Sequence, residues 1–191
     1  MKFVILHGTM GSPEGNWFPW LAGELKKLGQ TTIRPRLPTP RGQNPEKWTE
    51  VIKKAIESIG GPDQEIVVVA HSMSPWASCY YLGDIDRQIR AAFFVSPFAE
   101  QIEKEEPFHS LIQPFADGKV DWNKVKKNCK DIVCFVGDND PYVSLAVAKR
   151  FQKLCSGKKL IIVPKGGHLN AESGHTKFPL LLETIREELL I

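Results

Sequence analysis

The sequence predicts an α/β protein in which a mostly parallel central sheet of about six strands carries helices on both faces. Short apolar runs alternate with helical patterns along the chain. The clearest run, residues 66–70, is β-branched and unbroken, which is typical of a parallel strand buried on both faces. Because 191 residues suffice for one domain with a sizeable core, we expect a single domain over residues 1–191.

Each element follows from local pattern. The predicted strands are residues 3–7, 31–36, 66–70, 91–95, 132–136 and 160–163. The predicted helices are residues 20–28, 46–59, 123–128, 145–154 and 178–190. Residues 96–120 show no clear period and are long for a loop, so this stretch is either functional or contains short helices.

Composition excludes several classes of protein. The net charge is +3 and the basic residues are scattered, so we expect no nucleic-acid partner. No apolar run approaches the roughly 20 residues that span a bilayer, and the run at residues 3–6 is too short for a signal peptide. The four cysteines form no C-x-x-C pair, so we expect reduced thiols in a cytoplasmic protein and no metal site.

A serine follows the strongest predicted strand. The segment from Ala70 to Ser74 precedes a helical stretch, which is the context of a nucleophile elbow with the pattern G-x-S-x-G. Ala70 and Ser74 are small enough for such a turn, although neither is Gly. Taken alone, the segment fits equally well a Ser72 that only caps a helix.

Two later strands end near an acid and a histidine. Asp140 follows residues 132–136, and His168 follows residues 160–163. Functional groups in parallel α/β sheets lie outside the carboxyl ends of the strands, and Ser, Asp and His come in the chain order known for such sites. We therefore predict a catalytic triad of Ser72, His168 as base and Asp140, with Asp138 as the rival acid.

An oxyanion hole would complete the site. Its predicted donors are the backbone N–H groups of Met73 and Thr9, with Met10 as the alternative to Thr9. The predicted acyl pocket comprises Met10, Phe98, Phe108, Tyr142 and Leu169. For the last four of these residues, plain core packing is an equal alternative.

The chain resembles the small serine hydrolases of the retinoblastoma-binding protein 9 family. The similar segments are His7-Gly8, residues 17–21, residues 37–40 with Trp48, residues 122–129, Asp140-Pro141 and Gly167-His168. The resemblance implies an α/β-hydrolase fold without a cap domain, and it places the triad on Ser72, Asp140 and His168. Family members usually have Gly where this chain has Ser74, which could crowd the elbow or compete for a hydrogen bond with Ser72.

The predicted function is hydrolysis of small carboxylic esters or related acyl compounds through an acyl-enzyme, which requires no metal or organic cofactor. The alternatives are a thioesterase or amidase with the same triad, and a catalytically idle protein-binding module. The expected partner is a small acyl substrate, with no nucleic acid and no membrane. The chain has no Leu-x-Cys-x-Glu sequence, so binding to the retinoblastoma protein is not inferred, and a protein partner is unknown.

Overall fold

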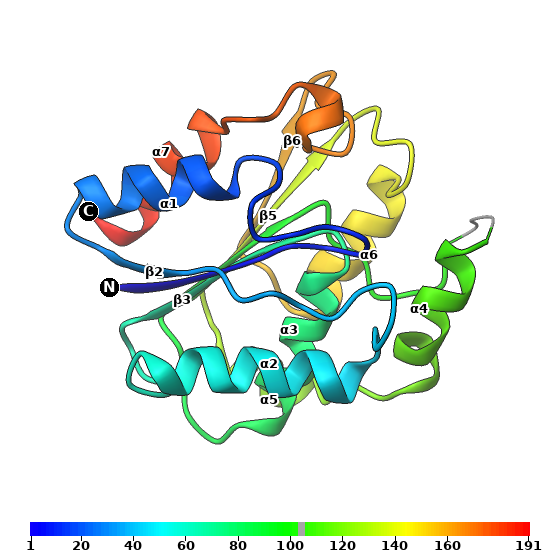
Figure 1. Cartoon of the computed structure of the whole chain (residues 1–191), viewed down its shortest axis with the longest axis horizontal. Helices are drawn as coiled ribbons and strands as arrows, with labels where there is room; N and C mark the ends of the chain where they lie inside the picture. Colours follow the sequence, from blue (N-terminus) through cyan, green and yellow to red (C-terminus); the bar gives the residue numbers. More distant parts are fainter. Residues whose placement is uncertain (103–105) are drawn as a thin grey trace.

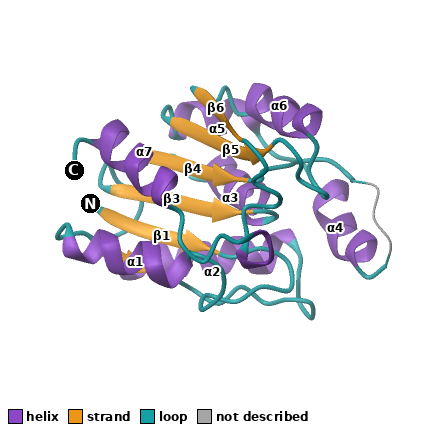
Figure 2. Cartoon of the chain, turned by 90° about the horizontal axis from the view of Figure 1, so that it is seen from above, coloured by secondary structure: helices purple, strands orange, loops and turns teal. Residues whose placement is uncertain are grey.

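A computed structural model describes residues 1–102 and 106–191. Its six strands form one parallel sheet in the order β2-β1-β3-β4-β5-β6. They are β1 (Lys2–Leu6), β2 (Thr31–Ile33), β3 (Ile66–His71), β4 (Ala91–Val95), β5 (Ile132–Gly137) and β6 (Lys159–Val163). The five labelled strands point the same way in Figure 2, and β2 pairs parallel to β1, so the carboxyl ends lie along one edge of the sheet.

Two layers of helices cover the sheet (Figure 1). The helices are α1 (Phe18–Lys27), α2 (Pro45–Ser58), α3 (Ser74–Asp84), α4 (Phe108–Asp117), α5 (Trp122–Asn128), α6 (Leu145–Leu154) and α7 (Pro179–Leu189). Helices α1 and α7 cover one face, whereas α2, α3, α5 and α6 cover the other. The predicted parallel sheet with helices on both faces is confirmed.

The strands supply both cores because successive side chains point to opposite faces. In β1, Phe3 and Ile5 pack against α1 and α7, and Val4 and Leu6 pack on the α2 and α3 side. All four are buried. Burial of both faces explains why the central strands are continuously apolar.

Several boundaries differ from the predicted ones. Strand β2 ends at Ile33, three residues early, and Pro35 follows soon after without an N–H group for a strand ladder. Helix α1 begins at Phe18 rather than Trp20, and Pro19 is accommodated in its first turn. The stretch 96–120 contains α4, which lies beyond the carboxyl ends of the strands in Figure 2.

Among the described residues, no helix combines the length and apolarity that crossing a bilayer would require. The four cysteines are buried and form no disulfide.

Candidate active site

Ser72 stands on a sharp turn between β3 and α3. Its backbone φ is +62°, a left-handed conformation that non-glycine residues seldom adopt. The Ser72 N–H donates to the Val95 carbonyl of the adjacent strand over 2.8 Å. Gly8 makes room on the other side, since a Cβ there would come within 2.8 Å of the Ser72 Cβ. A half-buried serine with a left-handed backbone at the carboxyl end of a strand is the geometry of a nucleophile elbow.

Ser74 supports this turn. Its Oγ lies 3.0 Å from the His71 nitrogen, 2.9 Å from the His71 oxygen and 3.1 Å from the Leu6 oxygen, and the side chain is fully buried. The hydroxyl is therefore bonded to the backbone of β3 and β1 rather than to Ser72. The concern that Ser74 would compete for a hydrogen bond with Ser72 does not apply to this geometry.

Ser72, His168 and Asp140 form one hydrogen-bonded chain. The His168 Nε2 lies 3.0 Å from the Ser72 Oγ, and the His168 Nδ1 lies 2.9 Å and 3.1 Å from the two Asp140 oxygens. Burial by itself would raise the pKa of Asp140. The hydrogen bonds from His168 and from the amides of Val143 and Tyr142 outweigh that effect, so this pKa lies below its ordinary value. Asp140 is thus held as the carboxylate, which can orient the imidazole and stabilise an imidazolium.

The two residues before Asp140 have a different role. Asp138 Oδ1 accepts from the Lys165 N–H over 2.7 Å, and Asn139 Oδ1 accepts from the Gly167 N–H over 2.7 Å. Both side chains thus connect the loop after β5 to the loop that carries His168. Asp138 makes no contact with His168 among the described interactions, which favours Asp140 as the acid.

The His168 loop is also tied to the loop after β1. The Trp17 Nε1 donates to the Leu169 carbonyl over 2.8 Å, and the Ala171 N–H donates to the Asn16 Oδ1 over 3.0 Å. The Ser173 hydroxyl accepts from the His168 N–H over 3.1 Å. These bonds hold the imidazole in place through its own backbone.

Thr9 and Met73 flank Ser72 from two elements. Within the described residues, neither backbone N–H has a hydrogen-bond acceptor. The Met10 N–H, the alternative donor, is instead bonded to the Thr39 Oγ1 over 2.8 Å. Gln43 holds the Thr9 hydroxyl through its Nε2 over 2.9 Å. Two free N–H groups at a helix start and an adjacent loop can receive a developing negative charge.

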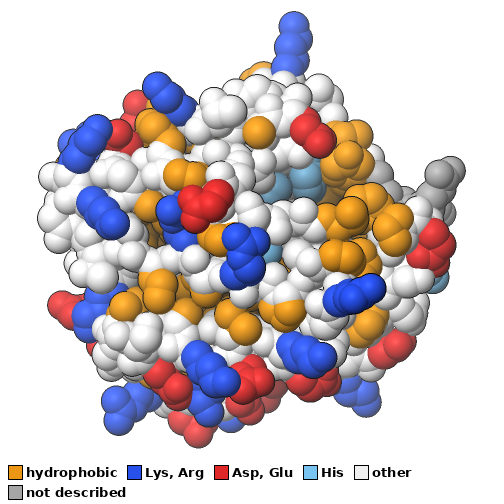
Figure 3. Space-filling model, viewed as in Figure 1, with side chains coloured by type: hydrophobic (Ala, Val, Ile, Leu, Met, Phe, Trp, Pro, Cys, Tyr) orange, Lys and Arg blue, Asp and Glu red, His pale blue; other side chains and the backbone are white. Residues whose placement is uncertain are grey.

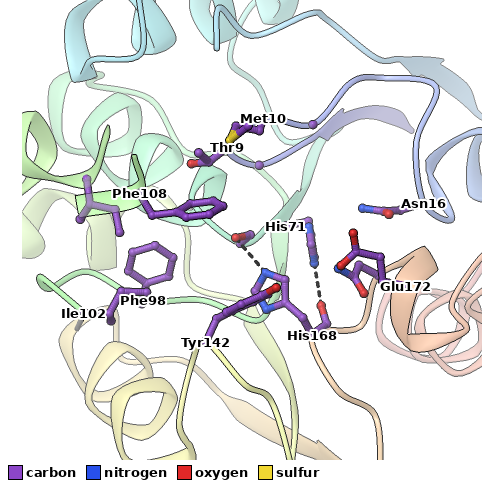
Figure 4. A pocket seen from close by; sticks show the side chains of 15 residues that line it. Thr9, Met10, Asn16, His71, Phe98, Ile102, Phe108, Tyr142, His168 and Glu172 are labelled. Carbon is purple, nitrogen blue, oxygen red and sulfur yellow. Dashed lines mark hydrogen bonds between the residues drawn. The ribbon is translucent and has the colours of Figure 1, made fainter. Parts of the chain in front are cut away.

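A cavity of about 410 Å³ opens over this chain of residues (Figure 4). It lies on a face where hydrophobic side chains gather beside histidines (Figure 3). The lining includes Ser72 and His168 together with five predicted residues, Thr9, Met10, Phe98, Phe108 and Tyr142. The Tyr142 ring stands edge-on to the His168 ring, with centroids 4.8 Å apart.

Leu169 is a correction to the predicted pocket. Its side chain is fully buried in the core between the sheet and helices α1 and α7. Its nearness in sequence to His168 suggested the pocket, but a left-handed φ of +51° at Leu169 accompanies a turn of the chain into the core.

Other lining residues were not predicted: Asn16, His71, Ile102, Ile112, Asn170 and Glu172. The helical spacing of Phe108 and Ile112 could have indicated that both lie on one face of α4. His71, the residue before Ser72, lines the same cavity. Its Nε2 donates to the His168 carbonyl over 2.9 Å.

Nothing in the described ranges, 1–102 and 106–191, groups three or more His, Cys, Asp or Glu side chains in a way that could hold a metal ion.

Comparisons with known proteins show the family of this chain. The family model described as serine hydrolase matches residues 3–187. The chain belongs to the serine hydrolase family. The rat serine hydrolase RBBP9 is 22% identical over 147 residues, which cover 74% of this chain and 73% of that protein.

Solved structures of other proteins have the same fold as this member of the serine hydrolase family. The ydeN gene product of B. subtilis has a TM-score of 0.88 at 22% identity, with 100% of this chain and 99% of that chain covered. Est1E from Butyrivibrio proteoclasticus, solved with ferulic acid bound, has a TM-score of 0.73 at 18% identity, with 99% and 88% covered. The protein has the α/β-hydrolase fold, and no separate cap domain is evident in the part of the chain that the structure describes.

Proposed function

We propose that this serine hydrolase cleaves small carboxylic esters through a Ser72–His168–Asp140 triad and an acyl-enzyme. The observation that carries the proposal is the unbroken chain of hydrogen bonds from Asp140 through His168 to Ser72. A serine hydroxyl needs an adjacent base to become a nucleophile, and the base needs a third group to orient it.

The steps follow from these positions. Ser72 Oγ attacks the carbonyl carbon while His168 Nε2 takes its proton, and the Thr9 and Met73 N–H groups stabilise the oxyanion. His168 then gives the proton to the leaving oxygen, whose bond to the acyl carbon breaks. Water activated by the same imidazole attacks the acyl-enzyme and releases the acid.

The apolar part of the cavity supports an acyl substrate. Phe98, Ile102 and Ile112 are buried at its wall, and Phe108 is 38% exposed at its mouth. Ferulic acid, which is bound in the Est1E structure, is itself a carboxylic acid of the size class that such a cavity accommodates. The same triad could also cleave a thioester or an amide, because these substrates differ from an ester only in the leaving group. A catalytically idle binding module is disfavoured, because simple binding does not require an aligned Ser–His–Asp chain.

A fluorophosphonate probe tests the proposal because it labels activated serines. We expect it to label the wild type and Ser58→Ala, a control at an exposed serine at the end of α2, but neither Ser72→Ala nor His168→Ala. Circular dichroism confirms that each variant is folded. Absence of labelling in folded wild-type protein would overturn the mechanism.

A further inference from the structure

The cavity has two chemically different ends. One end is apolar and is formed by Phe98, Ile102, Phe108 and Ile112. The other end, which we call the polar arm, is formed by Asn16, Asn170 and Glu172. Figure 4 shows Asn16 and Glu172 on the opposite side of the His71 and His168 rings from Phe98, Ile102 and Phe108.

The amides of the polar arm are held in place. The Asn16 Oδ1 accepts from the Ala171 N–H over 3.0 Å, and the Asn170 Oδ1 accepts from the Ser173 N–H over 3.0 Å and from its hydroxyl over 2.9 Å. These bonds fix the positions of both side chains beside Glu172 in the cavity lining. The arm is therefore a built polar surface on two anchored loops.

The leaving group of the proposed reaction belongs in this arm. His168 protonates the leaving oxygen, so that oxygen must lie near the Nε2 atom. Asn170 and Glu172 follow His168 on the same loop, whereas the aromatic residues of the apolar end come from the connection between β4 and β5. The acyl chain thus fits the apolar end, and the alcohol fits the polar arm.

The formal charge of the arm is negative. Glu172 is exposed, and its carboxylate makes no ion pair or hydrogen bond with any described residue. The cavity lining contains no Lys or Arg among the described residues. The other carboxylate of the site, Asp140, has a side chain with 0% exposure and is already bonded to His168.

We infer that the enzyme prefers esters of alcohols that carry an ammonium group, bound against the Glu172 carboxylate. The inference rests on the proposed function and names its substrate class. In the reaction the bond between the acyl carbon and the alkoxy oxygen breaks, the proton from His168 Nε2 goes to that oxygen, and the ammonium group is unchanged.

A pair of isosteric esters isolates the charge. Choline butanoate and 3,3-dimethylbutyl butanoate differ only in a quaternary nitrogen in place of a carbon. At low ionic strength we expect the wild type to favour choline butanoate in kcat/KM by about three- to fivefold, as for an exposed ion pair. Glu172→Gln should bring the ratio close to one, and Glu172→Lys should invert it.

The matched control is Glu183→Gln, which removes an exposed carboxylate on α7, outside the cavity lining. It should keep the wild-type ratio. Raising the salt concentration should reduce the wild-type preference, because salt screens exposed charges.

Two outcomes would overturn the inference, and they are distinguishable. If fluorophosphonate labels Ser72 but the wild-type and Glu172→Gln ratios are equal, the substrate class is wrong and the hydrolase mechanism stands. If folded wild-type protein is neither labelled nor active on either ester, both the proposed function and this inference fail.

Discussion

The His71 Nε2 atom donates a hydrogen bond to the backbone carbonyl of His168 over 2.9 Å, which joins the residue before the elbow serine to the residue that bears the imidazole. The two rings lie edge to face with centroids 4.9 Å apart. Ser96 Oγ is a longer donor to the same carbonyl, at 3.3 Å. His71 therefore helps to set the position of His168 relative to Ser72.

Replacing His71 by Phe should weaken catalysis without abolishing it. The ring volume is kept, but the donor to His168 is lost, and a net hydrogen bond of about 1 kcal/mol corresponds to about a fivefold lower kcat. His71→Gln, which retains an N–H donor, should recover part of the rate. Ester kinetics on both variants provide the measurement, and equal rates for wild type and His71→Phe would show that this bond does not position His168.

His71 should also make folding sensitive to acid. Burial, with the neighbouring His168 charge as a second cause, lowers the pKa of His71 from 6.5 to about 3. Below pH 6.5, His71 is protonated in the unfolded chain but stays neutral in the folded protein down to about pH 3. The free energy of unfolding therefore decreases as the pH falls through this range. The wild type should therefore lose up to about 1.4 kcal/mol per pH unit more than His71→Phe.

Urea unfolding of both proteins at pH 6.5 and 4.5 measures this difference. His7 and His175 also have lowered pKa values because of burial, but they are common to both proteins. Asp140 affects the free energy of unfolding at lower pH than His71 does. Because its pKa is lowered, its contribution to stability is lost only below about pH 4, where carboxylates become protonated. Equal losses of stability in the two proteins would contradict the assignment.

Asp140 and Asp138 form a matched pair of substitutions. Asp140→Asn removes the carboxylate that orients His168, and we expect kcat to fall by about 10³- to 10⁴-fold. Asp138→Asn keeps an oxygen that can accept from the Lys165 N–H, so its kcat should stay within about threefold of the wild type. A larger loss in Asp138→Asn than in Asp140→Asn would reverse their roles.

Ser74 should matter for stability more than for reactivity. In Ser74→Ala, the His71 N–H and the Leu6 carbonyl lose a buried partner, which should cost about 1–3 kcal/mol of unfolding free energy. Labelling of Ser72 by fluorophosphonate should persist, because the Ser74 hydroxyl does not bond to Ser72. Denaturant unfolding measures the loss of stability, and fluorophosphonate labelling measures the reactivity of Ser72. Loss of labelling in folded Ser74→Ala would refute the prediction that reactivity is retained.

Phe108 should limit acyl length. Phe108→Ala opens the mouth of the apolar end, so the ratio of kcat/KM for octanoyl over butanoyl esters should rise by about threefold or more, since each newly buried methylene contributes about 0.8 kcal/mol. Leu154→Ala is the control, because Leu154 is also 38% exposed but lies at the end of α6, outside the cavity lining. An unchanged ratio in Phe108→Ala would remove Phe108 from the acyl pocket.

The sequence by itself determined the sheet and the three residues of the hydrogen-bonded chain. Strands that are apolar at every position are buried on both faces, as in a parallel sheet covered by two layers of helices. The carboxyl ends of parallel strands lie at one edge of such a sheet. Ser72, Asp140 and His168 each follow a strand, so the pattern predicts that they meet at one edge of the sheet, with Asp138 as a rival to Asp140. The choice of Asp140 over Asp138 agrees with the hydrogen bonds that each carboxylate makes.

Only the tertiary structure decided the part of the cavity wall that the loop after β6 and the loop after β1 form together. Leu169 and Asn170 are adjacent in sequence, yet the Leu169 side chain enters the core and Asn170 lines the cavity. Leu169 itself has the left-handed backbone conformation that turns the chain at this point. Asn16 meets this loop from 155 residues away through its bond to Ala171. Such contacts depend on backbone angles and on which loops become neighbours, and neither follows from the period of a sequence pattern.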